Sequence, residues 1–315
     1  MTVAYPEDEV TASPASLPFI RHSSVTVAIV KAVLFFIFCL IIVLGNMLVC
    51  AAVVKFRRLQ RVTNYFIVSL AVADMLVGLV VMPFSAVHEV LGWWPFGMFC
   101  DVHASFDVTL CCASLYNLCI VSIDRYIAIT SPLTYHSKMT PKVALGLITL
   151  AWLAAFSTFI PMVMGLSREQ GFEYDYDNTT CKFVINKLFT FLITVPPFYI
   201  PSVFMVVAYA RMFTIARQQA RQITATQHNL RANGASICSM TLRERSRLAS
   251  DTKALRVVIT VVGVFIICWL PYFIVFPYDT FCRCVTDAVW GVTLWLGYLN
   301  SSFNPFIYAF NRDFR

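Results

Sequence analysis

Four ionisable side chains lie inside segments that are otherwise almost entirely apolar. Asp74, Asp107, Asp124 and Arg125 each fall within a long hydrophobic run. A charged side chain at the centre of a bilayer costs about 2.5–3.5 kcal/mol on insertion scales, so each one calls for a function and a partner. Asp107 and Arg125 are about five helical turns, roughly 27 Å, apart, which places them on one helix face. That face links the two ends of its segment, with an acid at one end and an ion pair at the other.

The amino-acid composition indicates that the segments carrying these charges lie in a membrane. Of the 315 residues, 59% are hydrophobic and 13% are charged, which is too apolar for the surface of a water-soluble protein. Seven stretches reach the roughly 20 apolar residues that a membrane-spanning helix needs. They lie near residues 27–54, 63–88, 97–130, 142–165, 187–217, 251–278 and 286–310. We therefore predict an all-α bundle of seven transmembrane helices over 27–310, between an N-terminal tail (1–26) and the start of a C-terminal segment (311–315).

The distribution of basic residues predicts the orientation. Lys and Arg gather in the loops after the first, third and fifth stretches, and such loops face the cytoplasm. The N-terminus is then outside, and the protein is expected in the plasma membrane as a multi-pass protein among lipids. The net charge of +7 is explained by these loops, so we expect no nucleic-acid partner.

Four of the eleven cysteines fall on the outer, oxidising side, where disulfides persist. Cys100 at the top of the third helix pairs naturally with Cys181 in the following outer loop. Cys282 and Cys284 are a second candidate pair. Asn178 begins a glycosylation sequon in the same outer loop as Cys181.

A polar seam crosses the middle of the predicted bundle. Asn300, Asn304 and Tyr308 recur at helical spacing around Pro305 and can face Asp74. With Ser114 on the third helix, we expect Asp74, Asn300 and Asn304 to hold ordered water or a sodium ion. Polar contacts that only join the helices are the alternative. No other cofactor or metal is expected.

Short motifs on all seven helices match one known family. They are Gly45-Asn46, residues 70–74 (LAVAD), Asp124-Arg125-Tyr126, Trp152, Pro201 with Tyr209, residues 268–271 (CWLP) and residues 304–308 (NPFIY). With these motifs in order, the chain resembles the rhodopsin-like (class A) G-protein-coupled receptors, and specifically their aminergic branch. Segments 117–126 and 295–305 look most similar to trace amine-associated receptors and to the type-4 serotonin receptor.

The resemblance implies a ligand site and a ligand class. An acid at the position of Asp107 holds a protonated amine in such receptors, beside an aromatic cage. The implied site comprises Asp107, Thr194, Trp269, Tyr272, Phe273, Phe276, Trp295 and Tyr298. Cation–π attraction supports this carry-over. Catecholamine receptors present serines to the ring hydroxyls where this chain has Ile193, Thr194 and Pro197, so a catecholamine ligand is disfavoured.

The resemblance also implies a cytoplasmic switch that acts on a heterotrimeric G protein, of the class that stimulates cyclic AMP production. Its residues would be Asp124, Arg125, Tyr126, Tyr209, Asp251, Asn304, Pro305 and Tyr308. In the resting state Arg125 would pair with Asp124 and reach Asp251. Activation would swing the sixth helix about Pro271.

Three alternatives concern the ligand and the class of protein. Acids around the outer mouth, among them Glu89, Glu173 and Asp279, favour a diamine or polyamine, or simply concentrate cations. A receptor for a peptide or lipid, with Asp107 in a structural role, is the rival of the same architecture. An enzyme is not expected, because no nucleophile, base or metal cluster stands out.

Overall fold

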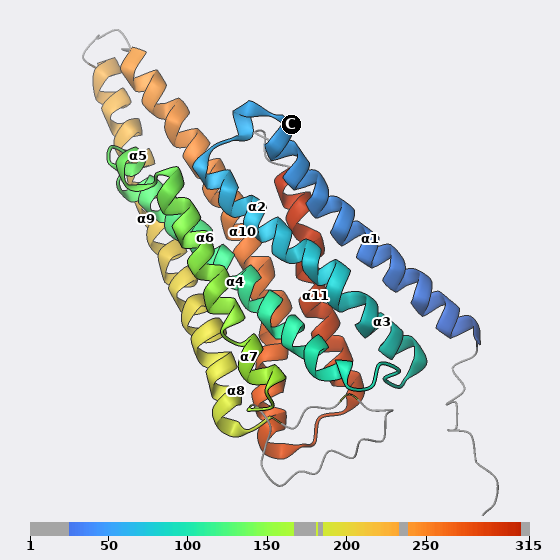
Figure 1. Ribbon diagram of the computed structural model, residues 1–315. Coiled ribbons are helices and arrows are strands. Elements are labelled where there is room, and N and C mark those ends of the chain that lie inside the picture. Colours follow the sequence, from blue (N-terminus) through green and yellow to red (C-terminus); the bar gives the residue numbers. More distant parts are fainter. Residues whose placement is uncertain (1–24, 167–180, 182–184, 233–238, 310–315) are drawn as a thin grey trace, which may run out of the picture.

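Figure 1 shows the computed structural model of the chain, which describes residues 25–166, 181, 185–232 and 239–309. The expected N-terminal tail up to residue 24, the C-terminal segment from residue 310 and Asn178 lie outside these residues. The helices are α1 (Val25–Lys55), η1 (Arg57–Leu59), α2 (Val62–Leu76), η2 (Val77–Val81), α3 (Met82–Leu91), α4 (Phe99–Thr130), α5 (Tyr135–Lys138), α6 (Pro141–Phe156), α7 (Phe159–Val163), α8 (Lys187–Thr194), η3 (Val195–Tyr199), α9 (Ile200–Ala232), α10 (Ser239–Cys282) and α11 (Asp287–Ala309).

The predicted all-α bundle is confirmed. Within the described residues, six helical segments are long and apolar enough to cross a membrane. They are Val25–Lys55, Val62–Leu91, Phe99–Thr130, Pro141–Val163, Lys187–Ile215 and Ile259–Cys282. The seventh predicted stretch is α11, which is also helical but less apolar, because it buries Asn300, Ser301, Ser302 and Asn304.

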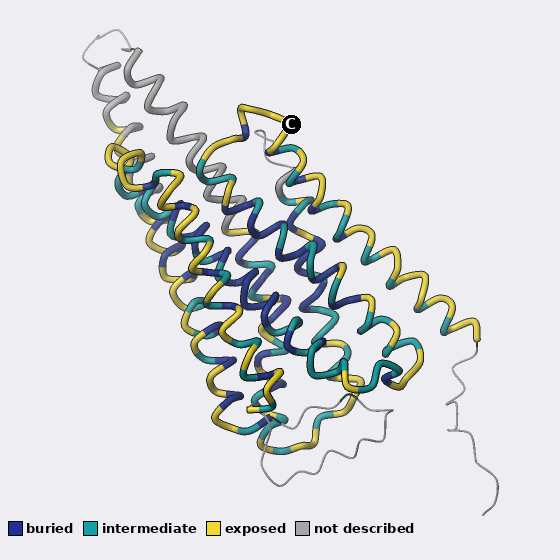
Figure 2. The backbone as a smooth tube through the Cα atoms, in the orientation of Figure 1, coloured by how far each residue is buried: buried dark blue, intermediate teal, exposed yellow. Residues whose placement is uncertain are grey.

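Burial separates the centre of the bundle from its periphery. In Figure 2 buried residues gather along the middle of the bundle, whereas α1 is mostly exposed. Half of α4 is buried, including Leu110, Leu115 and Leu118, whereas Phe36 and Leu48 on α1 are 64% and 67% exposed. In a membrane such an apolar outer surface lies against lipid and needs no protein partner.

Prolines inside the helices free backbone carbonyls, and side chains from other helices satisfy two of them. Proline has no N–H, so the carbonyl four residues earlier loses its helical donor. Pro277 frees the carbonyl of Phe273, which accepts a hydrogen bond from Tyr199 Oη at 2.7 Å. Pro305 frees the carbonyl of Ser301, which accepts from Asn46 Nδ2 at 3.1 Å. Each proline therefore joins its helix to a neighbour.

Two predicted spans contain a π-helical turn that the apolar pattern did not reveal. One is η2 in the second span, and the other is η3, which carries Pro196 and Pro197 in the fifth. A π turn adds a residue to the helix and shifts the face that the following residues present. The two turns thus set which side chains of α3 and α9 point into the bundle.

One close approach between α1 and α11 depends on a glycine. A Cβ atom on Gly45 would stand 2.9 Å from Cγ and 3.1 Å from Cβ of Pro305. The proline ring cannot rotate away, and the neighbouring bond between Asn46 and Ser301 fixes the spacing of the two helices.

We expect Gly45→Ala to destabilise the bundle by about 1–3 kcal/mol through overpacking. The measurement is the thermal unfolding midpoint of the detergent-solubilised protein. The matched control is Gly146→Ala on α6, where a Cβ atom meets nothing within 4 Å. Equal midpoints for the two variants would contradict the close approach.

Candidate functional site

Asp107 lies in the outer half of α4, at the edge of a cavity between several helices. Its carboxylate is partly buried. Within the described residues it accepts one hydrogen bond, from Tyr298 Oη to Oδ2 at 2.8 Å. The cavity is lined by Asp107, Val108, Cys111, Cys112, Ile193, Trp269, Tyr272, Phe273, Phe276 and Leu294. The site thus joins one carboxylate to a wall of apolar and aromatic side chains.

Four aromatic side chains of α10 form one wall of this cavity, as the resemblance implied. Tyr272 stands edge-on to Trp269, with ring centroids 5.7 Å apart, and stacks on Phe276 at 5.8 Å. Phe273 lies 6.0 Å from Trp269. The rings hold one another in place and present faces that attract a cation.

A glycine on α11 allows Trp269 its position. A Cβ atom on Gly297 would meet the indole ring of Trp269 at 2.7 Å. The next residue, Tyr298, is fully buried and reaches Asp107. Gly297 and Tyr298 therefore place both the floor of the cavity and the partner of the acid.

Two expected site residues lie elsewhere. The ring centroid of Trp295 lies 4.1 Å from that of Phe35 on α1 and 5.4 Å from that of Tyr298, and Trp295 is not among the lining residues. Thr194 is buried, and its hydroxyl donates to the carbonyl of Thr190 at 2.7 Å. Its hydroxyl proton is used within its own helix and Thr194 is not among the lining residues, so toward a ligand its oxygen could act only as an acceptor.

Four lining residues were missed by the sequence analysis: Val108, Cys111, Cys112 and Leu294. Cys111 and Cys112 lie one turn further along α4 than Asp107, and helical spacing alone could have indicated them. Leu294 comes from another helix, so only the packing of the bundle identifies it. Ile193 also lines the cavity, at a position that the resemblance had placed beside the ligand ring.

The polar seam in the middle of the bundle surrounds Asp74. Its carboxylate is fully buried and accepts hydrogen bonds from Ser114 at 3.2 Å, Ser301 at 2.8 Å and Asn304 at 2.6 Å. Ser301 takes the place that was expected for Asn300. Within the described residues Asn300 Oδ1 is buried without a hydrogen-bond partner, because one turn of α11 directs Ser301 and Asn304, not Asn300, at the acid.

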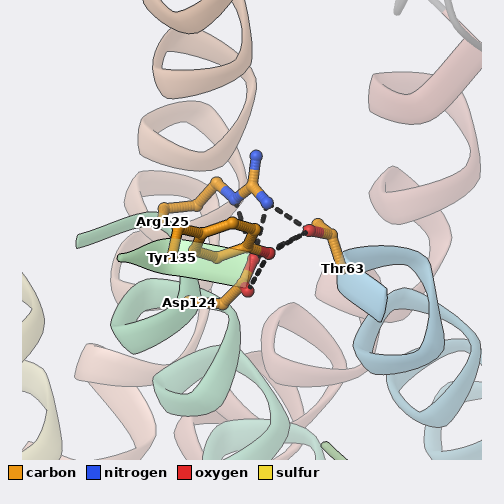
Figure 3. A network of polar contacts seen from close by, with 4 residues as sticks. All are labelled: Thr63, Asp124, Arg125 and Tyr135. Carbon is orange, nitrogen blue, oxygen red and sulfur yellow. Dashed lines mark hydrogen bonds and ion pairs between the residues drawn. The ribbon is translucent and has the colours of Figure 1, made fainter. Parts of the chain in front are cut away.

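At the inner end of α4, Asp124 and Arg125 form an ion pair of 2.6 Å. Figure 3 shows that Thr63 of α2 and Tyr135 of α5 complete the network. Asp124 is fully buried and accepts from Thr63 Oγ1 at 3.0 Å and from Tyr135 Oη at 2.7 Å. Arg125 also donates to Thr63. Three side chains from three helices, those of Thr63, Asp124 and Tyr135, thus form the network that holds the guanidinium at the end of α4.

The sequence analysis missed Thr63 and Tyr135. Tyr135 lies outside the membrane-spanning segments, and burial raises the pKa of its hydroxyl. The hydroxyl therefore stays protonated and acts as a donor to Asp124. A tyrosine eleven residues beyond Asp124 gives no local signal in the sequence, because the loop that returns it to α4 is set by tertiary packing.

The other expected switch residues are placed as follows. Tyr209 Oη and Ser122 Oγ lie 2.7 Å apart, Tyr126 packs partly buried against the core, and Asn304 bonds Asp74. Pro305 faces Gly45. Asp251 and Tyr308 lie on α10 and α11, but their side chains fall outside the described part of the chain.

Both expected disulfides are present. Cys100 at the start of α4 is bonded to Cys181, and Cys282 is bonded to Cys284 after α10. The first bond ties the outer loop to the helix that carries Asp107, two turns above the acid.

The chain was compared with known proteins. Residues 45–308 match the model of the 7 transmembrane receptor (rhodopsin family). The chain is 40% identical over 300 residues to the D(1) dopamine receptor of Carassius auratus, covering 86% of this chain and 82% of that protein. It is 39% identical over 311 residues to the D(1B) dopamine receptor of Homo sapiens, covering 86% and 65%.

These relatives are named for dopamine and not for trace amines or serotonin, so they do not establish the resemblance to trace amine-associated receptors or to the type-4 serotonin receptor. They do establish the family. The protein is a receptor and not an enzyme, and it is a multi-pass protein of the plasma membrane. The chain belongs to the rhodopsin-like (class A) family of G-protein-coupled receptors, within its aminergic branch.

Proposed function

We propose that the receptor binds a protonated arylalkylamine, with Asp107 as the acceptor of the ammonium group and the aromatic wall of α10 around the ring. One observation carries this proposal: a carboxylate inside the bundle has a neutral hydroxyl as its described partner and an aromatic cavity beside it. A desolvated carboxylate is stabilised by a counter-charge. The ligand supplies that charge.

The side of the cavity that would receive the ring of the ligand is apolar. Ile193, Phe273 and Phe276 line it, and Thr194 donates to its own helix. This arrangement supports an amine whose ring carries no hydroxyl groups that need partners. The relatives' names suggest dopamine as a candidate, but this side of the cavity gives a catechol no strong described acceptor or donor.

The partners of the described acids at the outer mouth favour a ligand with one positive charge over a ligand with two. Glu89 already pairs with Lys31 at 3.2 Å. Asp279 accepts from the backbone N–H of Val285 at 3.0 Å and from Trp290 Nε1 at 3.1 Å. Glu173 lies outside the described residues. A monoamine is therefore the simpler ligand.

On the cytoplasmic side we propose coupling to a G protein that stimulates cyclic AMP production. The network of Asp124, Arg125, Thr63 and Tyr135 (Figure 3) holds the guanidinium inside the bundle. A ligand shifts the receptor only by binding better to the state in which this network is open.

The surroundings of Asp74 fit a sodium ion or ordered water. Asn304, which donates to Asp74, leaves its buried side-chain oxygen without a partner among the described residues. Such oxygens can only accept hydrogen bonds or bind a cation. Asp74 would supply the negative charge, and an ion there would favour the closed bundle.

Asp107→Asn should lower the potency of 2-phenylethylamine several hundred-fold, because losing one partner of a desolvated ion pair costs about 3–5 kcal/mol. The measurement is the half-maximal concentration for cyclic AMP accumulation in cells with matched surface expression. Glu89→Gln is the control acid outside the cavity lining and should change potency less than about threefold. Retained potency in Asp107→Asn would favour the rival reading as a peptide or lipid receptor.

Hydroxyl groups on the ring of the ligand should add little to its affinity. Each new neutral hydrogen bond is worth about 1 kcal/mol, or roughly fivefold in affinity, so dopamine and 2-phenylethylamine should differ by less than this factor. Competition of the two amines for the same receptor measures the ratio. Thr194→Val keeps the shape of the side chain and should leave both affinities unchanged. A dopamine advantage above tenfold that Thr194→Val abolishes would contradict the apolar ring site.

Tyr135→Phe should raise ligand-free cyclic AMP production several-fold, because it removes a donor from Asp124 and so weakens the closed network by about 1 kcal/mol. Ser137→Ala, in the same short helix, removes an exposed hydroxyl that donates to the carbonyl of Thr134 and serves as the control. Basal production equal to wild type in Tyr135→Phe would show that this network does not restrain the receptor.

A further inference from the structure

Tyr298 is itself held by two buried polar side chains that the ligand site does not include. Ser85 Oγ on α3 lies 3.4 Å from Tyr298 Oη and 3.2 Å from His103 Nε2 on α4. Ser85 and His103 are each 8% exposed. Neither lines the cavity, so both reach the acid only through Tyr298.

The direction of each hydrogen bond follows from the number of protons. His103 Nε2 also lies 3.2 Å from the carbonyl oxygen of Val81. Because a carbonyl only accepts, this nitrogen carries a proton and is a donor. Tyr298 gives its one proton to Asp107, so its oxygen accepts from Ser85. The single proton on Nε2 is shared between the Val81 carbonyl and the Ser85 hydroxyl as a three-centre hydrogen bond. From Ser85 the donors run in one direction, through Tyr298 to Asp107.

The histidine ring is fixed from its other side by aromatic residues of the outer end. The centroid of Trp94 lies 5.1 Å from that of His103, and Phe84 stands edge-on at 6.1 Å. Trp94 is 2% exposed, and its Nε1 donates to the carbonyl of Gly97 at 3.1 Å. The ring of His103, the first donor of the series, is thus held in a fixed orientation.

The position of the Val81 carbonyl, which accepts from His103, depends on the π-helical turn. Val81 is the last residue of η2, and its φ and ψ are −103° and −59°. The turn brings the Val81 carbonyl and the Ser85 hydroxyl to the same nitrogen of His103. An uninterrupted α-helix would present a different face at this height.

We propose that Ser85 and His103 are positioning residues for amine recognition. They fix the hydroxyl of Tyr298 as a donor to Oδ2 of Asp107, which keeps the carboxylate oriented with its other oxygen toward the cavity. An oriented acceptor loses less freedom when the ammonium group binds. The inference rests on the proposed function, since it concerns the acid that binds the amine.

A plain packing role for the same residues predicts something different. Buried polar groups that only satisfy each other would affect folding, and their loss would act independently of Tyr298. A positioning role requires that the effect of Ser85 pass through the hydroxyl of Tyr298. Residues that act through one network are not additive when they are changed together.

The test is a double-mutant cycle on the full chain, read as competition binding and cyclic AMP potency of 2-phenylethylamine at matched surface expression. Ser85→Ala should weaken the amine about fivefold, the usual effect of losing one hydrogen bond. In a Tyr298→Phe background the same change should have no further effect. Ser105→Ala is the matched control, because this buried serine of α4 donates to the carbonyl of Asp101 and should leave affinity unchanged.

His103 gives a second arm if Ser85→Ala reaches the surface poorly. His103→Phe keeps the aromatic contact with Trp94 but removes the donor, and should weaken the amine by about the same factor. His103→Gln retains an N–H donor and should restore affinity. Thermal stability of the ligand-free receptor is measured for every variant, since a packing role would appear there.

The outcomes separate the two proposals. Suppose that wild type responds to the amine. If Ser85→Ala then leaves the affinity for the amine unchanged, or lowers it equally with and without the hydroxyl of Tyr298, the positioning role is overturned and the proposed amine receptor stands. If wild type binds neither 2-phenylethylamine nor another amine, the proposed function fails and the positioning role fails with it.

Discussion

Polar groups buried inside a helix bundle in lipid must find their partners inside the bundle, because the hydrocarbon offers none. This constraint accounts for most of the contacts between helices. The carbonyls freed by Pro277 and Pro305 accept from Tyr199 and Asn46. Trp152 Nε1 of α6 donates to Ser69 of α2 at 3.0 Å. Apolar packing brings the helices together, and these polar contacts fix which helix meets which and at what height.

The three acids inside the bundle meet the constraint in three ways. Asp124 is neutralised by Arg125 of its own helix, Asp74 is surrounded by neutral donors from α4 and α11, and Asp107 has one hydroxyl partner among the described residues. The first is an ion pair, the second is a carboxylate with three neutral donors, and the third is a carboxylate with one neutral donor. The most weakly satisfied acid is the one beside the cavity.

One helix connects these levels. Along α4 come His103, Asp107, Ser114 and finally Asp124 with Arg125, so a change in its position or rotation is felt at the ligand site, at the central network and at the cytoplasmic end. The disulfide from Cys100 anchors its outer end. Aromatic residues at the outer end, such as Trp94, pack on His103, which extends the ligand site's support beyond the residues that touch the cavity. Recognition and signalling thus share one rigid element.

The sequence by itself determined the number and place of the helices, the orientation in the membrane, the acid, the aromatic wall of α10 and both disulfides. Apolar run length, basic loops and helical spacing are local signals, so they can be read along one chain, whereas the aromatic wall was implied by the resemblance of the helix motifs to a known family. Only the tertiary structure decided that Trp295 and Thr194 do not line the cavity, that Ser301 joins Asn304 in donating to Asp74, and that Tyr135 and Thr63 reach Asp124. Those facts depend on helix rotation, which the π turns and proline positions set, and on contacts between residues distant in the chain.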